Sequence, residues 1–314
     1  MNRAKTVRLT LLVAASAVIA ILLSVIYMAV CPLPRHTVGL DAVLAKELGK
    51  QRDGLANYRC TLGAHRGDSL VHVENTRGAI VSARYAPKYA FIECDVQYSS
   101  DNRVIAFHDK RLRRVFGHRD KVGASTYAEL RDLTGGEIAT YEEVMDAASG
   151  KRINIEVKSQ GDDAEDQHLV DFIVADIKAR KMQKRVLVSS ISEDVVTYTS
   201  GRYPEIATGQ IFWIKASTYL HLDFLTRGLF RKLEESQADY LMLHVANLRN
   251  IGDLLRLKPT GKTIVFWDFD DTMYVIHKDL SDRLWGDSYL KTLLAQCRYR
   301  IRRSLSTDNG SRSL

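Results

Sequence analysis

Two acidic residues, Glu93 and Asp95, stand two positions apart inside the apolar stretch Phe-Ile-Glu-Cys-Asp-Val at residues 91–96. Side chains at this spacing on a strand point to the same side of a sheet, so both carboxylates are expected on one face. The apolar neighbours indicate a buried strand, where two close carboxylates repel each other unless a cation lies between them. A hard divalent ion with oxygen ligands is the occupant that this pair favours.

A second strand-like stretch, Ile-Asn-Ile-Glu-Val-Lys at residues 153–158, places Glu156 and Lys158 on one face. Glu156 could complete an acidic triad around the cation, and Lys158 could neutralise a phosphate oxygen. A salt bridge between strands is the alternative explanation of this pair.

Two histidines end strand-like stretches. His65 closes Thr-Leu-Gly-Ala-His and precedes Arg66, and His108 closes Arg-Val-Ile-Ala-Phe-His and precedes Asp109. An imidazole beside a guanidinium can transfer a proton next to a bound phosphate. Taken alone, the triplet His-Arg-Gly is common, and a hydrogen-bonded loop histidine is the alternative.

The stretches that carry these residues belong to an alternating pattern of strands and helices. Apolar runs typical of buried parallel strands lie at residues 61–65, 91–96, 153–158, 185–190, 206–212, 238–244 and 263–269. Helical patterns lie at residues 77–87, 140–149, 166–181 and 192–203. This many repeats without a glycine-rich dinucleotide turn favour an α/β fold, a closed (β/α)8 TIM-type barrel with its active face at the carboxyl ends of the strands.

Five short motifs occur in a fixed order along the first half of the barrel. They are His-Arg-Gly at residues 65–67, Glu-Asn-Thr at 74–76, Ile-Glu-Cys-Asp-Val at 92–96, His-Asp at 108–109 and Glu-Val-Lys at 156–158. In order and spacing they resemble the glycerophosphodiester phosphodiesterase family, over about residues 61–160. The resemblance implies metal-dependent hydrolysis of glycerophosphodiesters to glycerol 3-phosphate and an alcohol.

The resemblance also implies roles for individual residues. The divalent metal, Mg²⁺ or Ca²⁺, would be bound by Glu93, Asp95 and Glu156. The acid-base pair would be His65 and His108, with the proton donor and acceptor left open.

The substrate phosphate would be held by Arg66 and Lys158. Trp267 corresponds to the tryptophan of the late family motif Trp-Thr-Val-Asn, which reads Trp-Asp-Phe-Asp here, and is the candidate on the substrate side. The family's closing strand, Gly-Val-Asp-Gly-Ile, has no clear counterpart, and residues 285–290 are only a candidate. The short connection from His108 to Tyr141 predicts a small lid, which would admit lysophospholipids in a lysophospholipase D-type reaction.

The amino-terminal residues 1–31 combine a basic start with an uninterrupted apolar stretch from Leu9 to Val30. This length matches the roughly 20 residues of a transmembrane helix and predicts an uncleaved signal anchor. A cleaved signal peptide and a buried helix are the alternatives. The basic start predicts a single-pass membrane protein with a cytoplasmic amino terminus and a catalytic domain on the periplasmic or extracellular side.

The rest of the chain divides into three parts. We expect a linker and lead-in helix at residues 32–58, the barrel at 59–297 and a basic, disordered tail at 298–314. The net charge of +7 is concentrated at the two ends of the chain, which argues against a nucleic-acid partner. The four cysteines lack the paired spacing of zinc sites or disulfide frameworks.

Two other functions fit parts of the sequence. The run Thr-Ile-Val-Phe-Trp-Asp-Phe-Asp-Asp-Thr resembles a haloacid-dehalogenase phosphatase signature, with Asp268 as nucleophile and Asp270 as acid-base, but only 42 residues follow Thr272. The non-enzymatic alternative is an inactive, membrane-anchored protein that binds phosphodiesters. The three candidate metal ligands and the two histidines are all present, which favours an enzyme.

Overall fold

The computed structural model describes residues 3–30, 59–212, 231, 235, 237–244, 261–267 and 272–277. Several predictions lie outside these residues. They concern the linker and lead-in helix, the candidate closing strand at 285–290, the tail at 298–314, and Asp268 and Asp270.

The described strands form one ten-stranded sheet that closes on itself, because β1 pairs with both β2 and β10. The strands of the closed ring are β1 Arg59–Ala64, β2 Phe91–Tyr98, β5 Arg152–Val157, β6 Val186–Ser190, β7 Ala207–Phe212, β8 Tyr240–His244, β9 Thr263–Trp267 and β10 Thr272–His277. The seven strands predicted from apolar runs all belong to this ring, so the predicted barrel is confirmed in outline.

The direction of the last strand differs from the prediction. The pairs from β1 through β2, β5, β6, β7 and β8 to β9 are parallel, whereas β10 is antiparallel to both β9 and β1. Only residues 268–271 separate β9 from β10, and antiparallel strands need no crossover helix. The barrel therefore has a mixed sheet, and the phosphatase-like run begins with β9 and ends on the first residue of β10, so it belongs to the sheet of this barrel.

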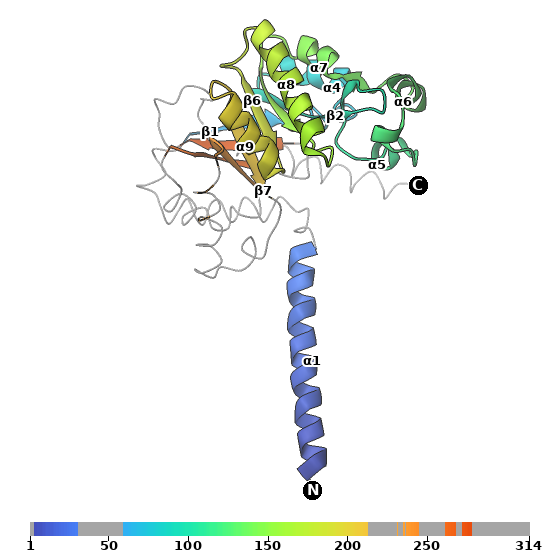
Figure 1. The fold of residues 1–314 in the computed structure, drawn as a ribbon, viewed down its shortest axis with the longest axis vertical. Coiled ribbons are helices and arrows are strands. Elements are labelled where there is room, and N and C mark those ends of the chain that lie inside the picture. Colours follow the sequence, from blue (N-terminus) through green and yellow to red (C-terminus); the bar gives the residue numbers. More distant parts are fainter. Residues whose placement is uncertain are drawn as a thin grey trace, which may run out of the picture.

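A small insertion, residues 104–140, stands on the carboxyl end of β2. It contains β3 Val104–Ala106, α5 Arg113–Phe116, η1 Val122–Ala124, α6 Tyr127–Leu133 and β4 Ala139–Thr140, and β3 pairs antiparallel with β2. Figure 1 shows α5 and α6 at one edge of the barrel. The insertion has its own apolar cluster: Ile105, Phe107, Leu112, Val122, Leu130 and Ile138.

Four helices cover the outside of the strands (Figure 1): α4 Arg77–Tyr85, α7 Tyr141–Ala147, α8 Asp163–Ala179 and α9 Glu193–Arg202. Each lies within a few residues of a predicted helix. Side-chain oxygens of the residue before each helix accept backbone N–H groups, with Thr140 and Glu143 forming a full capping box at α7. These caps fix where each strand-to-helix connection ends.

Side chains alternate between the two faces of each strand. On β5, Ile153, Ile155 and Val157 belong to the core between strands and helices, whereas Glu156 faces the interior of the barrel with its register partner Asp95. A separate interior cluster is apolar: Phe91, Leu187, Ile211, Tyr240, Met242, Val265 and Trp267. The interior thus has an apolar part and a polar part that includes the predicted site.

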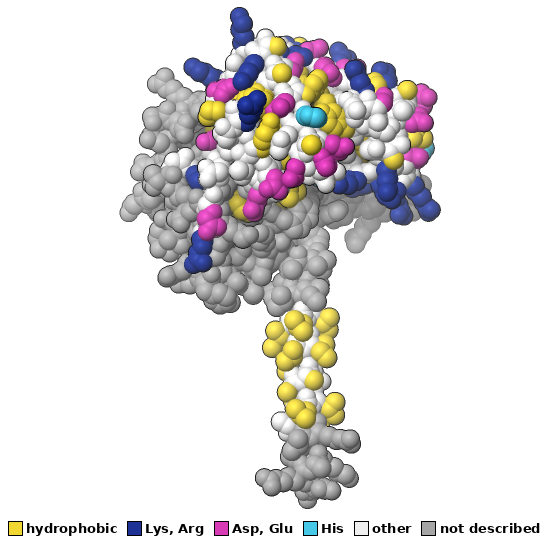
Figure 2. All heavy atoms as spheres, viewed as in Figure 1, with side chains coloured by type: hydrophobic (Ala, Val, Ile, Leu, Met, Phe, Trp, Pro, Cys, Tyr) yellow, Lys and Arg dark blue, Asp and Glu magenta, His cyan; other side chains and the backbone are white. Residues whose placement is uncertain are grey.

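At the amino terminus, α1 Arg3–Val30 is a single helix, and its side chains from Leu9 to Ser24 are exposed, many of them apolar (Figure 2). Within the described residues, no helix meets the length and hydropathy that crossing a bilayer requires. The predicted transmembrane helix is therefore not supported there.

A buried histidine of the barrel, His244, is expected to make the stability of the fold depend on pH. Burial lowers the pKa of His244 on β8 to about 4. The unfolded chain takes up this proton at higher pH than the folded chain, so the contribution of His244 to the free energy of unfolding falls as the pH drops from about 6.5 to about 4. We expect a loss of about 3 kcal/mol in this window that His244→Gln does not show.

Urea unfolding of both proteins across this window measures the difference. Burial also lowers the pKa of His65, so the wild-type curve contains a second contribution with the same sign. The comparison with His244→Gln isolates one of the two. Parallel curves for the two proteins would show that His244 does not carry the effect.

Candidate active site

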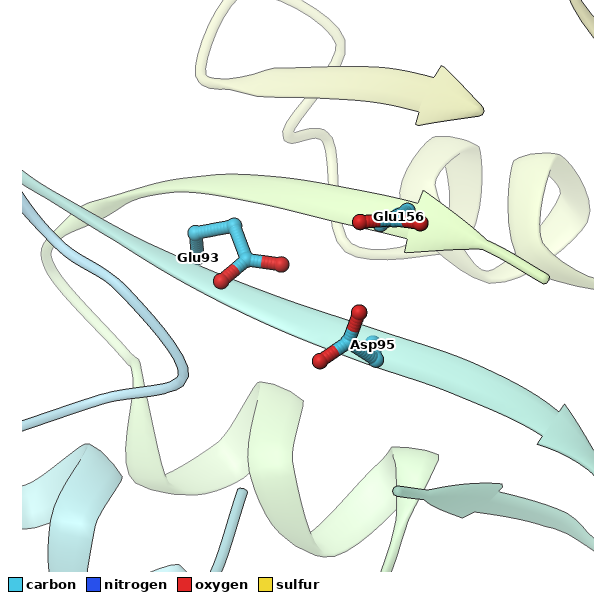
Figure 3. A group of neighbouring side chains, drawn as sticks. All are labelled: Glu93, Asp95 and Glu156. Carbon is cyan, nitrogen blue, oxygen red and sulfur yellow. The ribbon is translucent and has the colours of Figure 1, made fainter. Parts of the chain in front are cut away.

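The three predicted metal ligands come together inside the barrel. Glu93 and Asp95 extend from β2, and Glu156 extends from the adjacent strand β5, where it is the register partner of Asp95 (Figure 3). One oxygen from each carboxylate lies within 4.8 Å of the other two, and all three residues are buried. The two-residue spacing on β2 and the parallel pairing with β5 produce this convergence.

Burial and mutual repulsion disturb the protonation of these acids. Burial, and then the charges of Asp95 and Glu156, raise the pKa of Glu93 well above its usual range. Burial also raises the pKa of Glu156, although Lys158 opposes the shift. Burial acts in the same direction on Asp95, but Lys158, His108 and Arg66 outweigh it and lower its pKa. A cation among the carboxylates would relieve the repulsion.

The donor set fits a hard divalent cation. Glu93 Oε2 accepts the Arg66 backbone N–H at 2.7 Å, whereas the buried Glu93 Oε1 has no hydrogen-bond partner in the part of the chain that the structure describes. A buried acceptor without a partner costs free energy. Three convergent carboxylates are the ligand type that Mg²⁺ and Ca²⁺ prefer, and a cation would satisfy this oxygen.

The two predicted phosphate-binding cations lie at the same cluster. Arg66 Nε is 3.5 Å from Asp95 Oδ2, and Arg66 Nη1 donates to Glu74 Oε1 at 3.0 Å. Lys158 Nζ is 2.8 Å from Asp95 Oδ1 and also contacts Glu156. Asp95 and Glu156 raise the pKa of Lys158 against the effect of burial, so both cations are charged at neutral pH. They surround the acids with positive charge.

The two histidines lie near the acids. His65 is buried, and its Nε2 lies 3.8 Å from Glu93 Oε2. His108 lies close enough to influence the pKa of His65, Asp95 and Glu156 electrostatically. Its Nδ1 is 2.6 Å from Asp109 Oδ1. The structure therefore brings together the five residues predicted to bind the metal and transfer protons.

Trp267 lies at the end of β9 with its side chain buried in the interior cluster. Its ring meets the His244 ring edge to face at a centroid distance of 4.9 Å. A role toward the substrate stays a prediction.

Sequence reasoning assigned no role to Asn75, which supports Asp95 directly. Asn75 Nδ2 donates to Asp95 Oδ2 at 2.8 Å, and the Asp95 backbone N–H donates to Asn75 Oδ1 at 3.1 Å. Asn75 is buried and has a φ of 57°, a conformation that asparagine tolerates better than most residues. The Glu-Asn-Thr motif was the signal that could have pointed to it.

Asn75→Ala is expected to lower the free energy of unfolding by about 3 kcal/mol. The substitution removes the hydrogen bonds of Asn75 to the carboxylate and to the backbone N–H of Asp95, both buried, and it leaves a β-carbon at positive φ. Asn75→Gly is the matched variant, since it removes the same hydrogen bonds without the backbone strain. Urea unfolding should show both variants destabilised, with alanine the worse. Stability within about 0.5 kcal/mol of wild type in both would contradict this role for Asn75.

Two other buried polar residues lie beside the acids on neighbouring strands. Asn154 is the register partner of Glu93, and Ser189 is that of Glu156. Both are fully buried, and the side-chain N and O atoms of Asn154 and the Ser189 hydroxyl have no hydrogen-bond partner among the described residues. Asn154 stands two positions before Glu156, so strand periodicity could have placed it on the interior face.

Comparison with known proteins identifies the family of the chain. The model of the glycerophosphoryl diester phosphodiesterase family matches residues 65–285. The glycerophosphodiester phosphodiesterase of Bacillus subtilis (strain 168) is 24% identical over 256 residues, which cover 68% of this chain and 85% of that protein. The enzyme of the same name from Caldanaerobacter subterraneus subsp. tengcongensis is 27% identical over 166 residues, covering 48% of this chain and 65% of that protein.

Solved structures show the same fold. The glycerophosphodiester phosphodiesterase of Thermotoga maritima aligns with a TM-score of 0.50 and 26% identity, covering 66% of this chain and 85% of that one. An Oleispira antarctica phosphodiesterase in complex with the product sn-glycerol-3-phosphate aligns with a TM-score of 0.53 and 21% identity, covering 67% and 84%. Because the family model matches residues 65–285, more than half of the chain, the chain belongs to the glycerophosphoryl diester phosphodiesterase family.

Proposed function

We propose that this chain is a phosphoric diester hydrolase that cleaves glycerophosphodiesters to glycerol 3-phosphate and an alcohol. The observation that carries the proposal is the buried cluster of Glu93, Asp95 and Glu156 with the imidazoles of His65 and His108 nearby. Family membership gives the substrate class. The Oleispira antarctica relative, whose structure contains glycerol 3-phosphate, supports the product.

The acids would hold one divalent cation, Mg²⁺ or Ca²⁺. When bound, this cation supplies positive charge that stabilises the phosphoryl oxygens. Arg66 and Lys158 stand beside the same acids and would exchange part of their present contacts for the anionic diester. Their fixed positions orient the phosphate before reaction.

The histidines would move the two protons that hydrolysis requires. One imidazole accepts a proton from the attacking water, and the other donates a proton to the departing alcohol. At His108 the Nδ1 atom faces Asp109, so Nε2 is the nitrogen available for this transfer. Both rings lie near the acids. In-line displacement places the attacking and the departing oxygen on opposite sides of the phosphorus, so two separate imidazoles can serve them.

Incubation of the purified chain with glycerophosphocholine tests the proposal. We expect glycerol 3-phosphate and choline to form with added Mg²⁺ or Ca²⁺ and to stop forming with a chelator. Binding without product would favour the inactive binding protein. Unchanged turnover in Asp268→Asn would exclude the phosphatase interpretation.

The same assay compares the turnover of deacylated diesters with that of lysophospholipids. The proposed preference is for deacylated diesters, since the lipid-like alternative rests only on the predicted membrane proximity and on the small size of the insertion at residues 104–140. Faster release of the head group from lysophosphatidylcholine than from glycerophosphocholine would reverse this order.

We also propose a location, which stays a prediction: an amino terminus in the cytoplasm and a catalytic domain on the periplasmic or extracellular side. Its support is the apolar sequence of α1 and the exposure of its described side chains. Fractionation of cells that express the full chain, followed by alkaline extraction and added protease, tests it. Full release from the membrane fraction at alkaline pH would contradict an embedded anchor.

A further inference from the structure

One arginine of the insertion joins two loops of the active site. Arg114, on α5, donates to Asp109 through Nε at 2.7 Å and Nη2 at 3.1 Å. The same guanidinium donates to Glu74 through Nη1 at 2.7 Å and Nη2 at 2.6 Å. It therefore binds both oxygens of two carboxylates that come from different segments of the chain.

Each of these carboxylates also contacts a residue of the proposed mechanism. Asp109 Oδ1 lies 2.6 Å from His108 Nδ1, and Glu74 Oε1 accepts from Arg66 Nη1 at 3.0 Å. Arg114 is thus one contact away from both His108 and Arg66. It has no direct hydrogen bond to either.

We propose that Arg114 is a positioning residue that fixes the orientation and tautomer of His108 through Asp109, and holds Arg66 through Glu74. This inference rests on the proposed function for its kinetic consequence. A carboxylate held by one hydrogen bond can still rotate, whereas a forked guanidinium contact fixes its plane. With that plane fixed, His108 Nδ1–H donates a hydrogen bond to Asp109, and Nε2 of His108 is left unprotonated on the opposite side of the ring.

The exposure of Arg114 separates this role from a purely structural one. Its side chain is 48% exposed, compared with 15% for Glu74 and 23% for Asp109. Ion pairs with so exposed a partner contribute little to folding stability. Loss of the guanidinium should therefore appear in turnover and in the state of His108, while thermal stability changes little.

The kinetic test compares Arg114→Ala with Arg113→Ala, which removes an exposed arginine from the same helix. We expect Arg114→Ala to lower kcat for glycerophosphocholine about 10- to 100-fold, with KM changed less than about threefold. Arg114→Lys should recover only part of this loss, because an ammonium group restores the charge without the fork. Arg113→Ala should match wild type. Equal kcat values in Arg114→Ala and Arg113→Ala would overturn the inference.

A second measurement does not depend on activity. Nitrogen NMR of the histidine rings, with the His108 signals identified by their loss in His108→Gln, reports which ring nitrogen carries the proton. We expect the Nδ1-protonated tautomer in wild type and a mixture of tautomers in Arg114→Ala. An unchanged tautomer would overturn the inference even in an active enzyme. A wild type without hydrolysis but with this tautomer shift would refute the proposed function alone.

Discussion

Replacing Glu93 by glutamine is expected to lower cation-dependent turnover of glycerophosphocholine about a thousandfold and to abolish the stabilisation of the fold by Mg²⁺ or Ca²⁺. Glutamine keeps the shape of the side chain but removes one of three convergent charges. Charge stabilisation by a bound cation is worth several kcal/mol in the transition state, which corresponds to a loss of this size.

The same substitution is expected to leave the cation-free protein as stable as wild type or more stable. In the absence of a cation, burial and the charges of Asp95 and Glu156 oppose ionisation of Glu93. Glutamine removes that repulsion. A loss of function together with a gain in stability of the cation-free fold would indicate that Glu93 serves cation binding. An acid that stabilises the fold would show the opposite change in stability.

Glu165→Gln is the matched control, because it makes the same substitution at an exposed position on α8. Thermal unfolding with and without each cation, together with initial rates, measures both expectations. A Glu93→Gln protein that retains its cation-dependent rise in Tm and its turnover would contradict the assignment of Glu93 as a ligand.

Alanine at either histidine should give the second large effect. We expect His65→Ala and His108→Ala to reduce turnover by about 10²- to 10⁴-fold, the range for loss of a general acid or base. Neither residue belongs to the three-carboxylate group. The cation-dependent rise in Tm should therefore persist in both variants, which distinguishes loss of proton transfer from loss of the cation.

His118→Ala is the control for this pair, since His118 is an exposed histidine in the insertion. It should retain wild-type turnover. Activity within about threefold of wild type in either active-site variant would remove that histidine from the acid-base pair.

The parts of the site that depend on local spacing could be predicted from the sequence. Glu93 and Asp95 are on one strand, so a two-residue spacing places them on one face, and the apolar neighbours indicate their burial. Parallel pairing then brings Glu156 alongside Asp95. Seven of the eight ring strands were visible as apolar runs because both of their faces are covered.

Strand direction and long-range ion pairs could not be predicted in the same way. The eighth strand, Thr272–His277, follows β9 after a short acidic connection that resembled another enzyme's motif, and an apolar run does not reveal whether a strand pairs parallel or antiparallel. Arg114 and Glu74 are separated by 40 positions. In the sequence, Arg114 is one basic residue beside Lys110, Arg111 and Arg113, so only the folded chain shows its contact with Glu74.

Anomalous diffraction from crystals grown with Mn²⁺, a hard cation that takes similar oxygen ligands, tests the cation site most directly. One strong peak is expected within coordinating distance of the carboxylates of Glu93, Asp95 and Glu156. No peak among these side chains, at a Mn²⁺ concentration that supports turnover, or a peak held by other residues, would contradict the site.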